Sequence, residues 1–320
     1  MDSGILGAIV IEGHVQGLSN VRSLGELGVP VYVIDVANCL ARYSKYCKNF
    51  EQCPCFNRIE FVEFLVNLCK SEKLNGWLLV PSNDHIVENL SLHIDLLSHY
   101  YKMLVPKKDD LYRIINKNAL LDVARSCGTH IPETYGCSDI MRAAGLRYPV
   151  LLKGGHGLSF YKAMHEKAIQ ADSFADVLKI IKMLDGKYNL DDIMIQELIP
   201  DNGDNKVISF TCFAVSGQIR SYWMGRKLRE HPIKYGTATL AENVDCPLVL
   251  EEAVPLVAAL KYTGVCEIEF KYDMRDNVYK LIEINPRTWL WVGLAKACGV
   301  DYAKMMYQFV NGLVPCFSSA

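Results

Sequence analysis

The sequence predicts a mixed α/β and α+β chain made of three successive units. Strands alternate with helices over residues 1–105, a small α+β pattern follows over 106–196, and strands joined by hairpin turns dominate 197–320. The chain has 320 residues, half of them apolar, which is enough to give each unit a core. We therefore expect a doubly wound parallel sheet, then a small domain, then an antiparallel sheet.

The first unit shows the strand–helix alternation of a parallel sheet. "GAIVI" and "PVYVID" predict strands, and "LSNVRSLGELG" predicts a helix between them that ends at a glycine, where a C-cap belongs. "FVEFLVNLCKSE" is helical, "GWLLVPSND" is a strand and its exit, and "HIVENLSLHIDLLSHYY" is helical again. The apolar run near the N-terminus follows no basic segment and is too short to span a bilayer, so we interpret it as a buried strand.

The second unit combines a few short strands with two helices. "INKNALLDVARSCG" predicts a helix that ends at Gly128, "THIPETY" is extended, and "YPVLLK" is a strand followed by the glycine-rich "GGHGLS". "KAIQAD" and "IMIQELI" are strands, and "SFADVLKIIKML" is a helix with a serine N-cap. In the third unit, "VISFTCFAV", "GQIRSYWMG", "GVCEIEFKYD" and "NVYKLIEIN" predict antiparallel strands, and "LEEAVPLVAALKYTG" predicts a helix.

Composition excludes several classes of partner. The formal net charge is −2 and no block of like charge stands out, so we expect neither a nucleic-acid interface nor a membrane partner. The twelve cysteines are scattered singly among apolar neighbours, which favours a reducing cytoplasm over a disulfide framework. Cys47, Cys53 and Cys55 lack the paired spacing of a zinc site.

The hairpin "CEIEFKYDMRDNVYKLIEIN" carries the first candidate site. Side chains alternate faces along a strand, and a three-residue loop at 275–277 would place Glu269 opposite Glu283, with the Asn285 amide one step along. Like charges directly opposite destabilise a sheet, and a divalent cation such as Mg²⁺ would compensate. A solvated sheet face in another register is the equal alternative from the hairpin alone.

Two lysines lie where they could bind phosphate. Lys117 begins a predicted helix, and Lys153 ends the strand "YPVLLK" just before "GGHG". A glycine-rich turn exposes backbone N–H groups and can lie over phosphates. Most lysines are merely solvated, so neither is informative alone.

The order of these parts is more specific than any one of them. The chain runs from a lysine before a helix through "YPVLLK", "IQELIP" and a Glu-bearing strand to "EINPR". In this the sequence resembles the ATP-grasp superfamily, and it looks most like the carboxylate–amine ligase branch, which includes D-aspartate ligase-like and carbamoyl-phosphate-synthase-like proteins. The resemblance implies a pre-ATP-grasp domain at 1–105, a small lid domain at 106–196 and a C-terminal catalytic domain at 197–320.

The resemblance also implies an ATP cleft between the lid and the C-terminal sheet. Lys117 and Lys153 match phosphate-binding lysines, and Arg287 matches an arginine that steadies the phosphoryl or acyl-phosphate group. The hinge strand, which holds the adenine edge, is matched by Gln196, Glu197, Leu198 and Ile199. Asp204 is a looser match to a residue that binds the ribose. The ligands implied for Mg²⁺ or Mn²⁺ are Glu269, Glu283 and Asn285.

The implied activity is an ATP-dependent ligase that joins a small carboxylate, such as an amino acid, to an amine through an acyl phosphate. The short glycine turn after Lys153 favours the amide-ligase branch over bicarbonate chemistry. Substrates would be small molecules, with a homodimer as one option for assembly. The basic segment "GRKLREHPIKYGTATL" is the best substrate candidate or else a solvated loop, and its candidate residues are Arg226, Lys227, Arg229, Gly236 and Thr237.

Three alternatives stay open. A carbamoyl-phosphate-synthase-like kinase of bicarbonate or carbamate would use the same metal carboxylates. A non-catalytic nucleotide-binding regulator has no need for the full metal set. A dinucleotide-dependent oxidoreductase is poorly supported, because the glycines of "GHVQG" are spaced G-x-x-x-G and not G-x-G-x-x-G.

Overall fold

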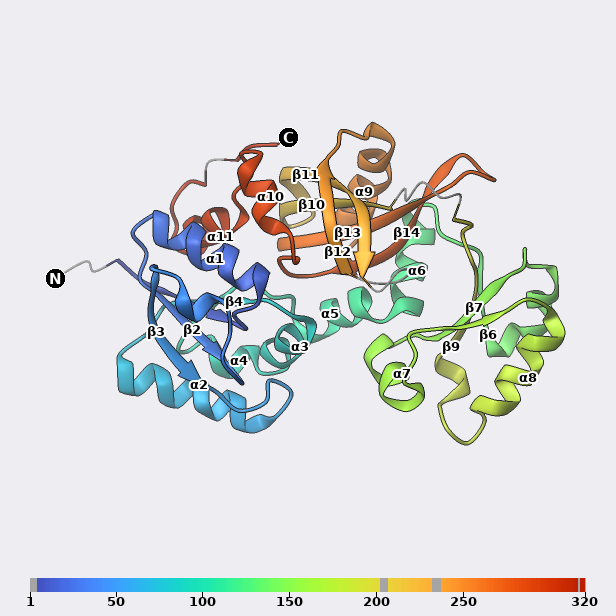
Figure 1. The fold of residues 1–320 in the computed structure, drawn as a ribbon, viewed down its shortest axis with the longest axis horizontal. Helices are drawn as coiled ribbons and strands as arrows, with labels where there is room; N and C mark the ends of the chain where they lie inside the picture. The colour runs from blue at the N-terminus through green and yellow to red at the C-terminus, as the bar shows by residue number, and fades with distance from the viewer. Residues whose placement is uncertain (1–4, 202–206, 232–236, 316, 320) are drawn as a thin grey trace.

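Three sheets follow one another along the long axis of the molecule (Figure 1). The computed structural model describes residues 5–201, 207–231, 237–315 and 317–319. The N-terminal sheet lies at one end, the C-terminal sheet in the middle and a small sheet at the other end, as Figure 1 shows. This order matches the three units expected from the sequence; the residue boundaries of the domains stay a prediction.

The N-terminal sheet is parallel, with strand order β3-β2-β1-β4-β5. The strands are β1 (Ala8–Ile11), β2 (Val31–Asp35), β3 (Cys47–Gln52), β4 (Leu78–Pro81) and β5 (Lys102–Met103). The helices are α1 (Val15–Glu26), α2 (Ile59–Glu72), α3 (Asp84–Leu92) and α4 (Ile94–Leu97), with the 3₁₀ turn η1 at Ala41–Tyr43. Every residue of β1 and β4 is buried, as expected for parallel strands covered on both faces.

Several elements differ from the sequence prediction. The expected long helix after β4 is broken at His93 into α3 and α4. Strand β3 was not expected, because no residue of this edge strand is fully buried and it shows no apolar run. Helix α5 (Lys108–Ile115) was also missed, since it begins in a charged run and buries only Leu111 and Ile114.

Helices α5 and α6 (Lys117–Cys127) lead to the small sheet, whose strand order is β6-β9-β7-β8. Its strands are antiparallel and comprise β6 (Thr134–Gly136), β7 (Val150–Gly154), β8 (Ile169–Ala171) and β9 (Ile193–Glu197). The remaining elements are α7 (Gly157–Met164), α8 (Phe174–Leu184), η2 (Cys137–Gly145) and η3 (Leu190–Asp192). The predicted caps are confirmed: Gly128 has φ +80° after α6, and the Ser173 side chain accepts from the Asp176 N–H.

The C-terminal sheet is antiparallel, with strand order β12-β11-β10-β13-β14. Its strands are β10 (Val207–Val215), β11 (Gln218–His231), β12 (Thr237–Asn243), β13 (Gly264–Asp273) and β14 (Val278–Asn285). The helices of this part are α9 (Pro247–Ala259), α10 (Val292–Ala297) and α11 (Tyr302–Val310). The solvated loop that was the alternative for the basic segment is wrong, because the described residues of this segment extend β11 to His231 and form β12.

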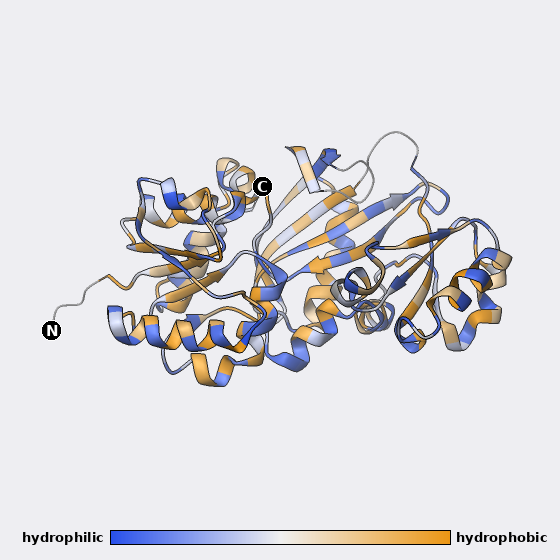
Figure 2. Cartoon of the chain, turned by 60° about the horizontal axis from the view of Figure 1, so that its bottom comes forward, coloured by the Kyte–Doolittle hydropathy of each residue, from blue (hydrophilic) through white to orange (hydrophobic). Residues whose placement is uncertain are grey.

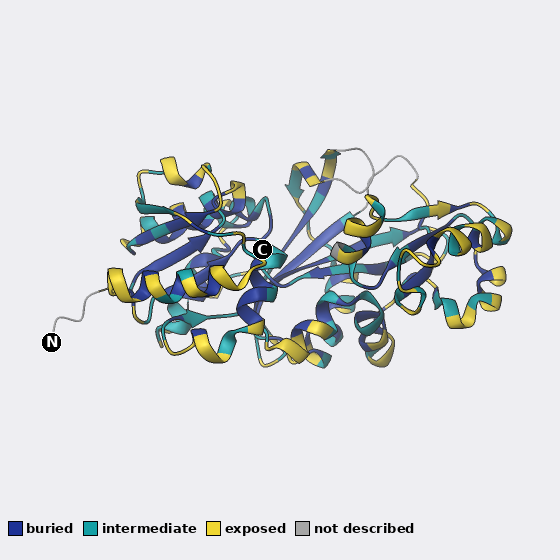
Figure 3. Cartoon of the chain, turned by 90° about the horizontal axis from the view of Figure 1, so that it is seen from below, coloured by how far each residue is buried: buried dark blue, intermediate teal, exposed yellow. Residues whose placement is uncertain are grey.

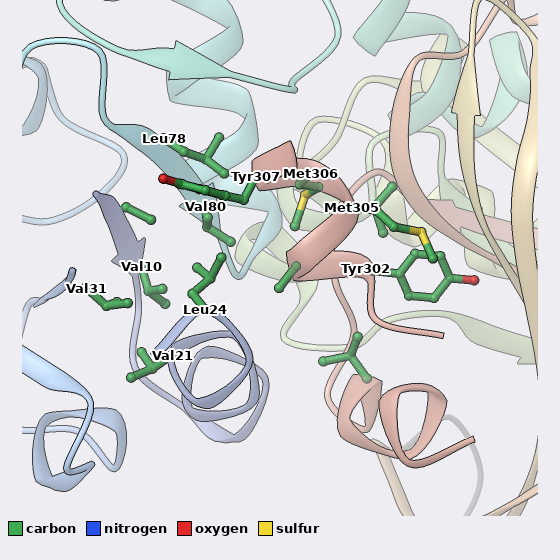
Figure 4. Close-up of a cluster of buried hydrophobic side chains, with 14 of the residues drawn as sticks. Val10, Val21, Leu24, Val31, Leu78, Val80, Tyr302, Met305, Met306 and Tyr307 are labelled. Atoms are coloured by element: carbon green, nitrogen blue, oxygen red, sulfur yellow. The ribbon is translucent and has the colours of Figure 1, made fainter. Parts of the chain in front are cut away.

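The last helices pack back onto the first domain (Figure 4). Val10, Leu24 and Val80 of the N-terminal sheet and α1 share one buried cluster with Tyr302 and Met305 of α11. The cluster removes apolar surface of both ends of the chain from water, which is the main favourable term in folding. The N-terminal and C-terminal sheets are therefore held together by a common core.

Apolar and polar residues alternate along the outer helices (Figure 2). The burial pattern agrees, since the strands are mostly buried and the exposed residues gather on the outer turns of helices and loops (Figure 3). In the ranges that the structure describes, no helix is both long and apolar enough to cross a membrane.

Candidate active site

The hairpin of β13 and β14 brings two carboxylates face to face. Glu269 pairs with Glu283, and Glu267 pairs with Asn285 in the ladder, as the sequence predicts. The route to this register differs from the prediction. Asp273 pairs with Val278, so the connection is one residue longer than expected, and a bulge between Glu269 and Phe270 restores the register.

Two lysines balance the charge of this carboxylate pair. Lys227 Nζ on β11 lies 2.6 Å from Glu269 Oε1, with both side chains nearly buried. Burial raises the pKa of Glu269 to about 7, against the opposing effect of the Lys227 charge. Burial would also raise the pKa of Glu283, but the charges of Lys117 and Lys227 outweigh it and lower that pKa to about 2. Glu283 is therefore ionised at neutral pH.

Glu267 orients the amide of Asn285. The buried carboxylate of Glu267 accepts from Ser209 Oγ at 2.8 Å and from Asn285 Nδ2 at 3.1 Å. Because the amide nitrogen is used in this way, its Oδ1 is left to accept from Arg287 Nη2 at 3.2 Å. The Asn285 oxygen thus lies on the same side as the arginine.

Arg287 connects the C-terminal sheet to the N-terminal domain. Its guanidinium donates from Nε to Asp84 Oδ1 at 2.7 Å and from Nη2 to Asp84 Oδ2 at 3.1 Å. Asp84 is the first residue of α3, directly after the exit of β4. This two-pronged geometry is the one in which guanidinium groups bind carboxylates. The Arg287 guanidinium, which binds Asp84 here, has a geometry that suits a carboxylate-type group at the domain boundary.

The two predicted phosphate lysines come from the lid side and reach the same region. Lys153 on β7 donates to Gln196 Oε1 at 2.6 Å, and Lys117 Nζ lies 3.4 Å from Glu283 Oε2. Burial and the nearby Lys117 charge lower the pKa of Lys153 to about 7. The Lys117 N–H donates to the carbonyl of Gly155 at 2.8 Å, so the start of α6 also holds the glycine turn. The structure brings both lysines to the hairpin carboxylates.

Side-chain hydrogen bonds anchor the hinge strand. Gln196 Nε2 donates to Thr134 Oγ1 at 2.8 Å, which fixes the amide that meets Lys153. The buried Glu197 carboxylate accepts a forked pair of bonds from Arg147, at 3.1–3.2 Å from Nε and 3.0 Å from Nη2. Glu197 is therefore a structural anchor through its side chain. The predicted hinge residues Leu198 and Ile199 follow directly, Leu198 as a donor to the Pro149 carbonyl and Ile199 as an acceptor from Lys271.

The basic segment divides between the two faces of the sheet. Lys227 faces the carboxylates, whereas Arg226 donates from Nε to Glu242 at 2.9 Å on β12. Arg229 and Thr237 are exposed. Asp204 and Gly236 lie outside the described residues. The tertiary fold therefore brings only Lys227 of this group to the site.

The residues present suit a magnesium ion that shares its ligands with phosphate. In the described ranges, no group of three or more His, Cys, Asp or Glu side chains forms a metal cage of its own. Mg²⁺ typically takes one or two protein carboxylates and completes its shell with phosphate oxygens and water. Glu269, Glu283 and the Asn285 amide supply such a partial set on one face of the hairpin.

Three contributors were missed at the level of sequence. Asp84 positions Arg287. Ser209 positions Glu267, and Thr134 positions Gln196. The polar run "SND" after β4 was the one available signal, since polar residues at the carboxyl end of a parallel strand face a ligand crevice. Ser209 and Thr134 carry no such signal in an apolar strand.

Comparison with known proteins finds similarity to one protein family over part of the chain. Residues 224–314 match the family described as "Carbamoyl-phosphate synthase L chain, ATP binding domain". A D-aspartate ligase of Enterococcus faecium (strain Aus0004) is 26% identical over 264 residues, which cover 77% of this chain and 62% of that protein. The chain thus spans about three fifths of the length of this curated relative.

Solved structures share the whole fold at low sequence identity. Biotin carboxylase from Campylobacter jejuni superposes with a TM-score of 0.74 at 15% identity, covering 97% of this chain and 72% of that one. N5-carboxyaminoimidazole synthetase from Staphylococcus aureus gives 0.72 at 15% identity, covering 100% and 81%. L-amino acid ligase from Bacillus licheniformis gives 0.68 at 14% identity, covering 97% and 75%. The expected fold class is confirmed: the chain has the ATP-grasp fold of these structures, and its residues 224–314 are similar to the carbamoyl-phosphate-synthase ATP-binding domain.

Proposed function

We propose that the protein is an ATP- and Mg²⁺-dependent ligase that joins a small carboxylate, such as an amino acid, to an amine through an acyl phosphate. The observation that carries the proposal is the opposed pair Glu269 and Glu283, which lies between the lid lysine Lys117 and the buried Lys227. An acid pair bordered by cations is suited to holding a metal–nucleotide complex. It has no evident purpose as a solvated sheet face.

Each side chain has a distinct task in this proposal. Lys117 and Lys153 bind the phosphates of ATP, while Glu269, Glu283 and Asn285 hold Mg²⁺. When bound, Mg²⁺ neutralises phosphate oxygens and so reduces the repulsion between ATP and an anionic acceptor. The hinge residues Gln196–Ile199 hold the base, and Asp204 the ribose. Phosphoryl transfer depends mainly on positioning and on electrostatic stabilisation, which these cations supply.

In this mechanism Arg287 interacts with the carboxylate of the substrate. It binds the substrate carboxylate in the fork that now holds Asp84, and it then stabilises the acyl phosphate. Lys227 supplies a second positive charge beside the same carboxylates. Arg226 pairs with Glu242 on the opposite face as a structural residue. We assign no catalytic step to Arg229, Gly236 or Thr237.

The relatives support an amide ligase. The sequence relative is a D-aspartate ligase and one structural neighbour is an L-amino acid ligase, so an amino acid is our preferred carboxylate. We further propose a cytoplasmic location, in keeping with single, unpaired cysteines in the described ranges. A homodimer is the assembly we favour, since one neighbouring biotin carboxylase domain was solved as a dimer.

A kinase of bicarbonate or carbamate is the second candidate. The matched family takes its name from carbamoyl-phosphate synthase, and its ATP-binding machinery would serve either acceptor. The two candidates differ in what triggers ATP cleavage. ADP release with bicarbonate alone would favour the kinase, whereas ADP release that needs both a carboxylate and an amine favours the ligase.

The test is ADP release from Mg²⁺-ATP against amino acids, hydroxy acids and bicarbonate, singly and in pairs with amines. Glu283→Gln should abolish turnover and leave the fold intact, because it removes one of the two opposed charges that hold the metal. Glu242→Gln is the matched control, since this carboxylate pairs with Arg226 on β12. Normal turnover by Glu283→Gln would refute the metal assignment. ATP binding without turnover for any pair would favour a nucleotide-binding regulator.

A further inference from the structure

A second group of polar residues lies where the strand order of the N-terminal sheet reverses. The order β3-β2-β1-β4-β5 places β1 beside β4, with Ile11 paired to Pro81 at their carboxyl ends. Ligands of open parallel sheets bind in the crevice outside the carboxyl ends of the strands at such a switch point. In this chain Glu12 follows β1 and residues 82–84 follow β4 at these carboxyl ends.

The side chains at this switch point hold one another in place. Glu12 Oε1 accepts from Asn83 Nδ2 at 2.8 Å, and Gln16 Nε2 donates to the Ser82 carbonyl at 2.9 Å and lies 3.4 Å from Glu12 Oε2. The Ser82 hydroxyl is 1% exposed and has no hydrogen-bond partner among the described residues. A buried hydroxyl without a partner costs free energy, so this turn is organised for more than its own stability.

The switch point connects directly to the proposed acyl-phosphate site. Asn83 is followed by Asp84, which holds the guanidinium of Arg287 in a two-pronged contact. Burial raises the pKa of Glu12, and Asn83, His14 and Arg287 counteract it, so the carboxylate lies within electrostatic reach of that arginine. The negative charge of Asp35 on β2 also raises the pKa of Glu12. Glu12 is thus hydrogen-bonded to Asn83, and the next residue, Asp84, is hydrogen-bonded to Arg287.

The proposed reaction needs a site of this chemistry next to Arg287. An amine is protonated at neutral pH and cannot attack a carbonyl until it loses a proton. An ammonium group is complemented by carboxylates and amide oxygens, which Glu12, Asp84, Asn83 and Gln16 provide. A partly desolvated carboxylate is also the better proton acceptor, because general-base efficiency grows as its pKa approaches the working pH.

We propose that the switch point of the N-terminal sheet is the amine subsite and that Glu12 both binds the ammonium and accepts its proton. This inference rests on the proposed ligase function. The ammonium gives one proton to Glu12, and the freed lone pair forms the C–N bond as the C–O bond of the acyl phosphate breaks. Inorganic phosphate leaves and takes the second proton from nitrogen, which yields the neutral amide.

Hydroxylamine separates this inference from the function on which it rests. It is unprotonated at neutral pH, so it can intercept an acyl phosphate without a general base. Wild-type protein is assayed for ADP release with D-aspartate and the other acids of the panel, first with hydroxylamine and then with ammonium, methylamine or amino acids. Glu12→Gln should keep hydroxylamine-dependent turnover within about twofold and lose about 10²–10⁴-fold in kcat/KM for the protonated amines, the usual range for loss of a general base.

Two further variants complete the design. Glu12→Asp keeps a carboxylate and should recover at least part of the loss, and Glu72→Gln at the end of α2 should leave both reactions unchanged. Urea unfolding midpoints confirm that each variant is folded. Equal effects of Glu12→Gln on both kinds of amine, or no effect on either, would overturn the amine subsite, as would wild-type protein that uses hydroxylamine but no protonated amine. Absence of hydroxylamine-dependent turnover with every acid would instead overturn the ligase function itself.

Discussion

Lys227 Nζ lies 2.6 Å from Glu269 Oε1, and the two side chains are only 9% and 12% exposed. The neighbouring Arg226 reaches the opposite face, where it and Glu242 are 36% and 41% exposed. Two adjacent residues of β11 therefore form ion pairs in opposite environments. In the buried pair, Lys227 compensates the charge of Glu269, which also lies opposite Glu283 in the ladder.

Removing the inner lysine should destabilise the fold strongly. Lys227→Met leaves the Glu269 carboxylate buried without its cation, which typically costs about 3–5 kcal/mol of unfolding free energy. Arg226→Met is the matched control and should cost less than about 1 kcal/mol, because exposed ion pairs contribute little. Urea denaturation at pH 8 measures both values. Similar losses for the two variants would contradict the difference in environment.

ATP binding should take up a proton near pH 8. The pKa of Lys153 is lowered to about 7 by burial and by the Lys117 charge, so at pH 8 its amine is mostly neutral in the free protein. Phosphate oxygens favour the charged form and raise this pKa, so binding draws a proton from solution and affinity falls as pH rises from 7 to 9. Calorimetry in two buffers of different ionisation enthalpy measures the uptake.

The Lys153 assignment has a simple control. Lys153→Met should abolish the proton uptake and weaken ATP binding by about 1–3 kcal/mol, the scale of a hydrogen bond to a charged group. Lys182→Met on the exposed face of α8 should change neither. Undiminished uptake in Lys153→Met would assign the titrating group elsewhere.

The lid should open more readily at alkaline pH. His156 Nε2, at the start of α7, lies 3.1 Å from Glu88 Oε1 on α3. The hydrogen bond and charge of Glu88 raise the pKa of His156 above its ordinary value. A raised histidine pKa means that the ion pair is complete below about pH 6.5 and is lost as the pH rises through the folded-state value.

Hydrogen exchange detects this contact. After correction for intrinsic rates, the amides of α7 should exchange faster at pH 8.5 than at pH 6. Glu88→Gln should remove the difference, while Glu63→Gln on α2, far from the lid in sequence and domain, should preserve it. A pH difference that persists in Glu88→Gln would show that another group controls the lid.

The stability of the hinge strand β9 and its binding of ATP should depend on Arg147. This guanidinium binds the buried Glu197 and also Asp276 of the β13–β14 turn, at 2.9 Å from Nη1 to Oδ1. Arg147→Met removes the guanidinium but keeps the backbone N–H that donates to Glu197 at 2.9 Å, with Arg275 at 3.4 Å from the same carboxylate. We expect a loss of about 1–3 kcal/mol in unfolding free energy and a higher KM for ATP. Arg142→Met, whose guanidinium lies over the Tyr135 ring, is the control and should leave the KM unchanged.

The β13–β14 hairpin shows what can be predicted from the alternation of side chains between the two faces of a strand. Alternation alone places Glu269 opposite Glu283, and the structure confirms the pair. The turn and the bulge that produce it were not predictable, because a turn one residue longer and a one-residue bulge cancel in the register. The same limit applies to β3 and α5, which have too few buried residues to leave a periodic signal.

Sequence by itself determined the order of the three units, most of their strands and helices, and the residue types of the proposed nucleotide and metal site. These features depend on local periodicity, capping and spacing, which are written within a few residues. Only the tertiary structure decided that Lys227 and not Arg226 meets the carboxylates, that Asp84 holds Arg287, and that Glu12 lies within reach of it. Lys227 and Glu269 are 42 positions apart and meet through the pairing order of the C-terminal sheet. Asp84 and Arg287 are 203 positions apart and meet between two domains whose sheets are held together by a shared buried core.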